Sequence, residues 1–574
     1  MSNKGIVFLS LATTLLFSLS LFSQEKELGT EVVNIVKPYS PTISDAFKVK
    51  ETPSLYDSTS TQKKKVKYTI FSVPVASTFT PVKGTASNIK KPKSEKTYDN
   101  YATLGFGNYT TILGELYSNF EISRTDNVGF FFRHNSSQGD IKGVKLDNKF
   151  YDTSLDANYT SRQRDATYSL DFGVEHQLFN WYGLNEEYQT YSQTVLDGID
   201  PKHSYFSGYL GGSMAFDNSI FEKAALNVRY LGDSFSSSEI NAVLKPEFTI
   251  PFESLNLKVD GDIDYLAGSF DRDYFNTGGI KYSNLNAGLA PSLSYANEDL
   301  SVSLGVAGYV SMDTENSETE FSLFPRLKAS YRLLDESVII YGGAEGGLEQ
   351  NTYYNFKEQN PFVSPTLYVL PTKNIYEGFA GIKGMVSNLV GYNLRASYGQ
   401  DENKAFFQAN QLKAVATGLE GYEYGNSFNV VYDDLNTLEV FGELQFAVSK
   451  MFSLGVNANY FNYKTDLQEH AWNMPEFKAS LFSNFNITEQ LYGGASIFYV
   501  GERKDLVLDS NTLSEVVTLD VYVDANVHFG YRFTERLSAF AKGSNLFSDN
   551  YTKWMNYPVQ GIQVLVGATY KFDW

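Results

Sequence analysis

The five histidines stand far apart in the sequence, and none forms a pair at the spacing of metal ligands. They are His134, His176, His203, His470 and His528. The chain has no cysteine, which excludes disulfides, thiolate metal ligands and cysteine nucleophiles. It also has no Gly-x-Ser-x-Gly elbow and no phosphate-binding glycine loop. The sequence therefore predicts no enzyme activity, no cofactor and no metal site.

Aromatic side chains are present in excess: the 574 residues include 43 Phe, 41 Tyr and 4 Trp. Two long stretches between strand-like segments, residues 178–201 and 351–373, are rich in them, and eight are candidate contact residues: Trp181, Tyr182, Tyr188, Tyr191, Tyr353, Tyr354, Phe356 and Phe362. Aromatic faces bury a large area at little entropic cost, so these loops could grip a sugar or a lipoprotein partner. An equally open alternative is that they fold over and narrow the mouth of the protein.

The charge of the chain is divided between two unlike regions. Residues 24–97 contain 13 Lys and 7 Asp or Glu, a net charge of +6, while the whole chain carries −19. The acidic remainder makes nucleic acid an unsuitable partner, because phosphate binding needs a basic face. The opposite signs also suggest that the basic segment could enter an acidic interior.

The first residues have the pattern of a secretory signal peptide. Lys4 precedes an apolar run from Gly5 to Phe22, and small or polar residues follow. A membrane anchor helix is the alternative interpretation of such a run. We expect a signal peptide over residues 1–23, and no later stretch is apolar enough to cross a membrane as a helix.

Residues 24–97 predict an extended periplasmic segment. Prolines at 38, 41, 53, 74, 81 and 92 interrupt any helix, and no long periodic pattern occurs. We expect this segment to precede a separate domain that begins near residue 98.

From residue 98 onward, apolar and polar residues alternate in long segments. One example is residues 166–174, where Tyr168, Leu170 and Phe172 alternate with polar residues. Another is the run from Val517 to Phe533, which we expect to form one strand, and a further strand is expected over residues 390–400. Because successive side chains of a strand face opposite sides, each segment has an apolar and a polar face. The segments exceed the usual strand of about 5–6 residues. Short turns alternate with long loops between them, as in membrane barrels.

The fold class predicted for residues 98–574 is all-β: a large antiparallel transmembrane β-barrel of about 22 strands, preceded by the short extended N-terminal periplasmic segment. The last strand ends on an apolar, aromatic face that includes Tyr570, Phe572 and Trp574. A terminal aromatic in such a strand resembles the signal read by the outer-membrane barrel assembly machinery. The expected location is the outer membrane, with its lipids around the barrel.

The barrel region resembles the TonB-dependent receptors of the outer membrane, of the Bacteroidota type. The resemblance rests on the stretch from Gly543 through Asn545, Leu546, Tyr557 and Pro558 to Gly561, and on the final strand. Asn360-Pro361-Phe362 and Tyr432-Asp433-Asp434 are also similar to such barrels. Residues 24–97 are shorter than the plug of these receptors, so a full plug domain is not expected.

The resemblance implies nutrient uptake coupled to a TonB-like energy-coupling protein. A TonB-box-like segment is Thr30, Glu31, Val32, Val33, Asn34, Ile35 and Val36. The alternative is a barrel without a plug that acts as a docking subunit of an outer-membrane complex, with a surface or periplasmic lipoprotein as partner. The sequence does not name a substrate.

Overall fold

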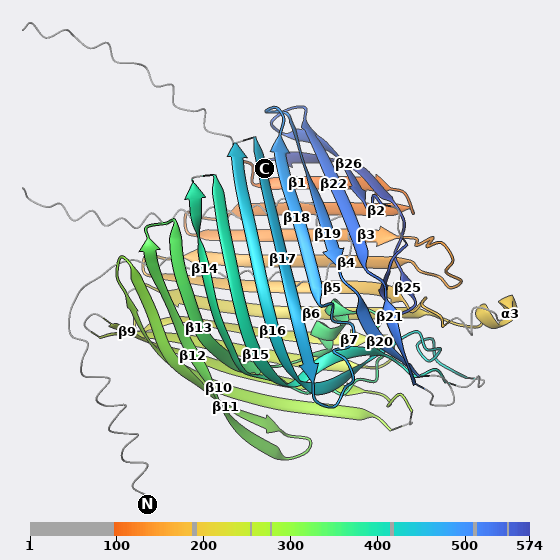
Figure 1. Cartoon of the computed structure of the whole chain (residues 1–574). Coiled ribbons are helices and arrows are strands. Elements are labelled where there is room, and N and C mark those ends of the chain that lie inside the picture. The colour runs from red at the N-terminus through yellow and green to blue at the C-terminus, as the bar shows by residue number, and fades with distance from the viewer. Residues whose placement is uncertain are drawn as a thin grey trace, which may run out of the picture.

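The alternating segments of the sequence form the wall of a closed barrel in the computed structural model (Figure 1). The structure describes residues 97–185, 192–217, 219–252, 255–275, 278–387, 389–413, 418–449, 451–508, 514–547 and 550–574. The expected TonB-box-like segment, Tyr188 and Tyr191 lie outside these residues.

Twenty-two strands make up the wall, and each is antiparallel to its neighbours. Strands that follow one another along the wall are paired in sequence order, and the first pairs with the last. The wall strands are β1 (Asn100–Gly107), β2 (Thr111–Glu121), β3 (Asp126–Ser137), β4 (Phe150–Arg162), β5 (Ala166–Asn180), β6 (Lys202–Phe216), β7 (Phe221–Asp233), β8 (Ser238–Phe252), β9 (Leu255–Phe270), β10 (Ile280–Ala296), β11 (Leu300–Asp313), β12 (Glu318–Leu334), β13 (Val338–Glu349), β14 (Thr372–Ser387), β15 (Val390–Ala409), β16 (Phe428–Ser449), β17 (Phe452–Thr465), β18 (Phe477–Asn486), β19 (Leu491–Val500), β22 (Tyr522–Arg532), β23 (Leu537–Ser544) and β26 (Gln563–Phe572).

The remaining elements are short and belong to the connections between wall strands. Two small hairpins and two helices are described: β20 (Arg503–Leu508) with β21 (Ser514–Leu519), β24 (Thr552–Trp554) with β25 (Tyr557–Pro558), α3 (Gln193–Leu196) and α4 (Tyr353–Gln359). Among the described helices, none has the length and apolar character needed to cross a membrane.

The alternation along each wall strand separates an apolar outer face from a mostly polar inner one. On β5, Leu170 and Phe172 are 52% and 46% exposed on the outside, whereas Asp171 lies between them on the lumen face. Its register partner on the next strand, Gly211, faces the lumen too. In lipid every backbone N–H and C=O must find a partner within the protein, and a closed ladder of strands provides one for each.

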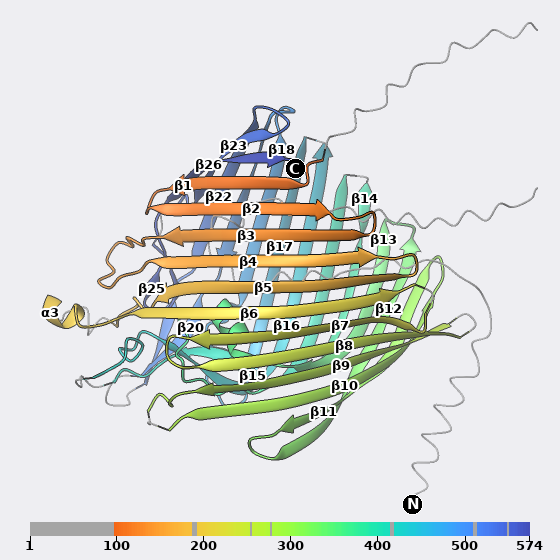
Figure 2. The ribbon, with the colours of Figure 1, turned by 180° about the vertical axis from the view of Figure 1, so that it is seen from behind.

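The two ends of the barrel differ in the length of their connections (Figure 2). At one end, which we call the turn end, connections such as residues 163–165 and 297–299 are only a few residues long. At the other, the loop end, the longest connections are residues 138–149, 181–201, 350–371, 410–427, 466–476, 501–521 and 545–562. Residues 97–99 lead into β1 at the turn end. There the centre of the Tyr98 ring lies 5.4 Å from the guanidinium carbon of Arg536.

The seam between β1 and β26 is fixed by the side chain of Asn100, which is 1% exposed. Its amide nitrogen donates to the carbonyl oxygen of Phe572 at 3.1 Å, and its amide oxygen accepts from the hydroxyl of Ser118 at 2.5 Å. Trp574 also donates to the Ser118 hydroxyl, at 2.9 Å, and its ring stacks on Phe120. The C-terminal aromatic residue is therefore part of the closure of the barrel.

The structure corrects two of the expected strand boundaries. The alternating run from Val517 to Phe533 is not one strand: β21 ends at Leu519 in a hairpin outside the wall, and β22 starts at Tyr522. A hairpin strand alternates as a wall strand does, so the sequence pattern hides the break. β15 is longer than the expected 390–400, because a register shift between Asp401 and Lys404 interrupts the alternation without ending the strand.

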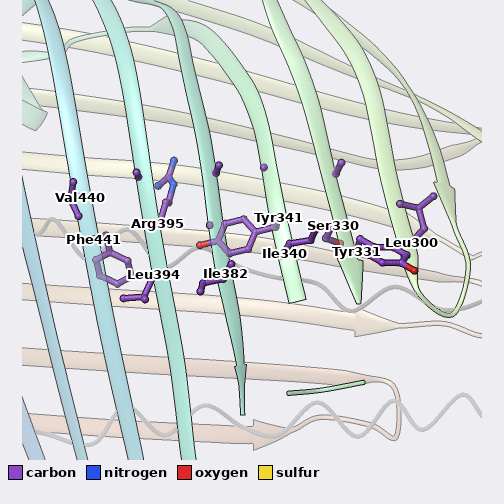
Figure 3. A pocket seen from close by; sticks show the side chains of 15 residues that line it. Leu300, Ser330, Tyr331, Ile340, Tyr341, Ile382, Leu394, Arg395, Val440 and Phe441 are labelled. Carbon is purple, nitrogen blue, oxygen red and sulfur yellow. The ribbon is translucent and has the colours of Figure 1, made fainter. Parts of the chain in front are cut away.

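A shallow groove of about 720 Å³ crosses the outer face of β12–β16 in the half of the barrel near the turn end (Figure 3). Exposed apolar side chains flank it, including Tyr331, Ile340 and Ile382. Small residues, among them Gly342 and Ala380, form its floor. The groove belongs to the apolar outer surface and lies apart from the loop end.

Replacing Asn100 with Ala is expected to weaken the seam. The change leaves the buried Ser118 hydroxyl and Phe572 carbonyl without this partner, which costs about 1–3 kcal/mol for a buried group. The temperature at which the folded barrel loses its compact mobility in SDS gels should fall by several degrees. Glu298→Ala, in an exposed turn, is the matched control and should leave that temperature unchanged.

Candidate functional site

The connection between β13 and β14, residues 350–371, enters the barrel at the loop end and carries α4 (Figure 1, the short green coil inside the ring of strands). Tyr353 and Phe356 of α4 are 1% and 2% exposed. They belong to one buried cluster with wall residues of β6, β7, β9 and β10: Tyr205, Leu231, Leu266, Phe270, Ile280 and Tyr282. We call residues 350–371 the inner loop.

Local sequence explains why α4 is short. The hydroxyl of Thr352 accepts the N–H of Asn355 at 2.9 Å, which is the usual N-terminal cap. Asn360 precedes Pro361, and a residue before proline is pushed away from helical backbone angles. The helix therefore ends at Gln359; Asn360 is extended, and a turn follows at Pro361 and Phe362.

Two carboxylates of the wall hold the start of α4. Glu239 on β8 accepts the backbone N–H groups of Tyr353 and Tyr354 at 2.6 and 3.0 Å, and the hydroxyl of Tyr282 at 2.7 Å. Asp233 at the end of β7 accepts the Tyr353 hydroxyl at 2.9 Å. Both side chains are buried, so each needs these donors to offset the loss of water.

A buried lysine holds the middle of α4. Lys357 is 1% exposed, and its ammonium group lies 3.2 Å from a carboxylate oxygen of Glu175 on β5 and 2.5 Å from the amide oxygen of Gln177. It also lies 2.7 Å from Glu358 and 4.3 Å from the centre of the Tyr354 ring. A buried ammonium is tolerated because partners surround it on several sides.

The other end of the inner loop is joined to the opposite part of the wall. Val363 forms an isolated parallel bridge with Phe428 of β16, and the Ser364 N–H donates to the Phe428 carbonyl at 2.9 Å. The ring of Phe362 stacks on Tyr557 with centres 3.7 Å apart. The inner loop thus contacts both the β5–β10 side and the β15–β16 side of the barrel.

The described parts of three further connections, residues 181–201, 410–427 and 545–562, pack on the inner loop, and together with it they form what we call the loop cap. The indole N–H of Trp181 donates to the Phe362 carbonyl at 3.1 Å, and the Tyr182 hydroxyl donates to the Pro558 carbonyl at 3.0 Å. The side-chain amide of Asn426 donates to the Trp181 carbonyl at 2.7 Å. The Tyr557 hydroxyl donates to the Asn426 carbonyl. Burial raises the pKa of the Tyr182 and Tyr557 hydroxyls well above the usual range.

Charged residues tie a neighbouring connection, residues 271–279, to the cap. Arg272 donates to the Tyr422 hydroxyl at 2.9 Å and lies 3.4 Å from a carboxylate oxygen of Glu423. The Lys413 ammonium lies 2.7 Å from the same carboxylate. Burial raises the pKa of Tyr422 to about 12, although the Arg272 partner acts in the opposite direction.

Hairpin β20–β21 is held beside the cap by Asp505, which is fully buried. This carboxylate accepts the N–H groups of Ala409 and Leu506 at 3.1 and 2.8 Å, and the side-chain amide of Asn473 at 2.9 Å. Burial raises the pKa of Asp505 to about 6 despite these donors. One carboxyl group therefore joins β15, the connection 466–476 and the hairpin.

The structure brings together six of the eight aromatic residues singled out in the sequence. Within the described residues, Trp181, Tyr182, Tyr353, Tyr354, Phe356 and Phe362 lie in or against the loop cap and are mostly packed rather than free. Tyr188 and Tyr191 fall outside the described residues. The six described residues therefore pack together at the loop end of the barrel.

Sequence reasoning missed the polar residues that position the cap: Glu239, Asp233, Lys357, Asn426 and Asp505. Lys357 had a usable signal, because it is the only basic residue of an otherwise aromatic and amide-rich loop. The carboxylates had none, since acidic residues also occur at exposed ends of strands. In the part of the chain that the structure describes, no three His, Cys, Asp or Glu residues are grouped so as to hold a metal ion.

The closed 22-strand wall with long connections at one end defines the class of fold: it is the barrel of the TonB-dependent outer-membrane receptors. The apolar outer face and this fold fit an outer-membrane location. No family model matches the chain, and no curated protein matches its sequence.

Solved structures of this class share the fold of the chain at low sequence identity. The FrpB iron transporter of Neisseria meningitidis is 10% identical with a TM-score of 0.65, and the match covers 83% of this chain and 82% of that one. The ferripyoverdine receptor of Pseudomonas aeruginosa is 12% identical, with a TM-score of 0.60 over 84% and 72%. The copper transporter OprC is 14% identical, with a TM-score of 0.57 over 84% and 82%. At these identities the likeness shows a shared fold.

Asp505 is expected to make the cap pH-dependent. Its pKa is about 6 in the folded protein and about 3.9 in an unfolded chain. The protonated form is thus favoured by folding, and its contribution, complete below about pH 4, is lost as the pH rises through 6. Amide hydrogen exchange at Leu506 and Ala409, corrected for intrinsic rates, should be faster at pH 7.5 than at pH 5. Asp505→Asn should remove the difference, whereas Glu469→Gln on the neighbouring surface should keep it.

Asn426→Ala is expected to loosen the cap without unfolding the barrel. The change deletes the donor to Trp181 and Gly421 and leaves their buried carbonyls without this partner. Hydrogen exchange in residues 181–185 and 421–428 should accelerate at least tenfold, while exchange in wall strand β11 should stay the same. Unchanged exchange near Trp181 would show that this amide does not hold the cap.

Proposed function

We propose that the chain is an outer-membrane uptake receptor, with the loop end facing the cell exterior and the turn end facing the periplasm. The observation that carries the proposal is the closed, apolar-faced 22-strand barrel whose loop end is covered by its own packed connections. A solute must meet the loop cap before it reaches the lumen. The structural neighbours are outer-membrane receptors, which supports the same role.

The solute would be captured on the loop cap, and its transfer through the lumen would need energy from the periplasmic side. The segment Thr30–Val36 is the proposed contact for a TonB-like energy-coupling protein, which would pair with it as an added strand. This segment precedes β1, whose first residue lies at the turn end, the proposed periplasmic side. Membrane lipids would surround the wall, and the C-terminal strand with Tyr570, Phe572 and Trp574 would serve the barrel assembly machinery.

The domain boundaries follow the same proposal: a signal peptide over 1–23, a basic periplasmic segment over 24–97, and the barrel over 98–574. The segment 24–97 carries a net charge of +6, whereas the barrel is strongly acidic. We propose that the segment acts as a reduced plug that enters the lumen from the turn end, favoured by these opposite charges.

The substrate is proposed only as a nutrient that diffusion does not supply fast enough. The printed names of the neighbours give ferripyoverdine, iron and copper as their own cargo. Growth of a deletion strain on limiting iron, copper or single carbon sources would identify the nutrient for this chain.

Deleting residues 30–36 should abolish energy-dependent uptake of the identified nutrient and leave the amount of folded barrel unchanged. Deletion of residues 84–90, an equally long part of the same segment, is the control and should keep most of the uptake. Equal loss in both variants would argue against a specific contact at Thr30–Val36.

Deleting residues 28–96 tests the proposed plug separately. Single-channel conductance in planar bilayers should rise severalfold when the segment is removed, because a wide barrel would lose part of its obstruction. An unchanged small conductance would contradict the plug.

A further inference from the structure

Most of the acidic residues on strands β4–β9 face the lumen, because alternate side chains of a strand point to the same side. They are Asp152, Asp156, Asp171, Glu175, Asp233, Glu239, Glu247, Asp260, Asp262 and Asp264. The basic residues on this face are fewer: Arg162, Lys223, Arg229, Lys245 and Lys258. We call the lumen face of β4–β9 the acidic wall.

The opposite side of the ring is nearly neutral. Strands β17–β19 lie across the lumen from β6–β8 (Figure 1). Their lumen face carries amide and hydroxyl groups, and the Ser480 hydroxyl donates to the side-chain oxygen of Asn457 at 2.6 Å. Among the described residues of these strands, Lys478 is the only charged one on that face. The lumen therefore has an acidic side and a neutral side.

One row of the acidic wall, which we call the acidic row, has a carboxylate at each end and short side chains between them. Asp171 of β5 pairs with Gly211 of β6, which pairs with Asn227 of β7. Asn227 pairs with Val243 of β8, which pairs with Asp264 of β9. A Cβ atom on Gly211 would lie 3.4 Å from both Asp171 and Asn227, so these side chains share the lumen side. Four strand spacings put the two carboxylates about 19 Å apart.

The two carboxylates of the acidic row form no ion pair within the described residues. Asp264 accepts the side-chain amide of Asn241 at 2.6 Å, and Lys245 acts on it only from a longer distance. The neighbouring Lys258 is paired with two other carboxylates of the acidic wall. Asp171 and Asp264 are both half-buried rather than enclosed, so a cation in the lumen can reach them.

The basic segment that precedes β1 contains a run of such cations. Residues 63–67 read Lys-Lys-Lys-Val-Lys, and we call them the lysine run. Thirty residues separate Lys67 from Thr97, which gives the run a reach of up to about 100 Å from the turn end. Asp171 lies five residues beyond the start of β5, about 17 Å along the strand from the same end. The tether is therefore long enough for the lysine run to meet the acidic row.

We propose that the lysine run docks along the acidic row, with its ammonium groups paired to Asp171 and Asp264. A single exposed ion pair is weak, so docking depends on several lysines and on the tether, which keeps their local concentration high. The docked segment covers the acidic side of the lumen and leaves the neutral side of β17–β19 uncovered. This inference rests on the proposed entry of residues 24–97 from the turn end, but on neither the substrate nor the coupling protein.

Cross-linking between introduced cysteines tests where the lysine run lies. The natural chain has no cysteine, so Gln62→Cys beside the run can be combined with one lumen thiol at a time in the full chain. Asn227→Cys places that thiol in the acidic row, and Asn457→Cys is the matched control on the neutral side. Each position lies five or six residues from the turn-end start of its strand. A bifunctional maleimide on outer-membrane fragments should join Gln62→Cys to Asn227→Cys with at least five times the yield, as read by peptide mass spectrometry.

The two yields also separate failure of the docking from failure of the proposed plug. Equal yields, or a higher yield with Asn457→Cys, would overturn the docking alone, because the segment would enter the lumen without choosing the acidic side. No cross-link to either lumen thiol would overturn the proposed plug together with the docking. The preference for Asn227→Cys should shrink in about 1 M NaCl, because salt screens the attraction between lysines and carboxylates.

Charge reversal tests whether the lysine run itself is the docking element. The first variant carries Lys63→Glu, Lys64→Glu and Lys65→Glu, and it should lower the yield with Asn227→Cys at least fivefold. The matched control changes the net charge equally in another part of the segment, through Lys90→Glu, Lys91→Glu and Lys93→Glu. It should keep most of the yield. Equal losses in the two variants would show that only the total charge matters, and they would overturn docking of this run.

Reversal of the acidic row tests the partner side of the contact. Asp171→Lys and Asp264→Lys, added to the first variant, should restore the higher yield with Asn227→Cys, because both partners then carry opposite charges again. The compact mobility of the folded barrel in SDS gels shows whether these wall substitutions still fold. A folded barrel in which the yield is not restored would overturn pairing with these two carboxylates. If the barrel does not fold, the two lysine variants decide the question on an unchanged wall.

Discussion

Closure of the backbone hydrogen-bond ladder is the constraint on which the rest of the structure depends. An open edge of the wall would present unpaired N–H and C=O groups to lipid, where nothing can satisfy them. The pairing of β1 with β26 from Asn100–Phe572 to Gly107–Leu565 removes that edge. Asn100 and Trp574 then secure the seam near the turn end through Ser118. In this closed ring the alternation places apolar side chains on the outer face and polar side chains toward the lumen.

Closure of the ring creates a lumen, and the chemistry of the lumen permits the loop cap. A mostly polar interior can supply Glu239, Asp233 and Glu175 as partners for an inserted loop, whereas an apolar core could not accept Lys357. The aromatic residues of the cap pack in one buried cluster with wall residues such as Tyr205 and Tyr282 and with Phe428 and Tyr557. The cap therefore combines charged and polar partners with an apolar, aromatic cluster.

The wall was predictable because its signal is local. In β5 and β26 each apolar position is set by the neighbouring lipid, so the two-residue period is written directly in the sequence. The misassigned run from Val517 to Phe533 shows the limit of this signal, because the hairpin strand β21 alternates in the same way as β22. The register shift after Asp401 hid the continuation of β15 to Ala409, because it interrupts the alternation within one strand.

The sequence by itself determined the class of fold. The two-residue alternation and the aromatic last strand can both be recognised from residues that are close together in the sequence. It also indicated the two aromatic loops. Only the tertiary structure decided what those loops do: Lys357 meets Glu175 and Gln177 across about 180 positions of sequence. Phe362 meets Tyr557 across a still longer interval. Such contacts exist because closure of the ring brings distant strands to one mouth, and no local pattern encodes that distance.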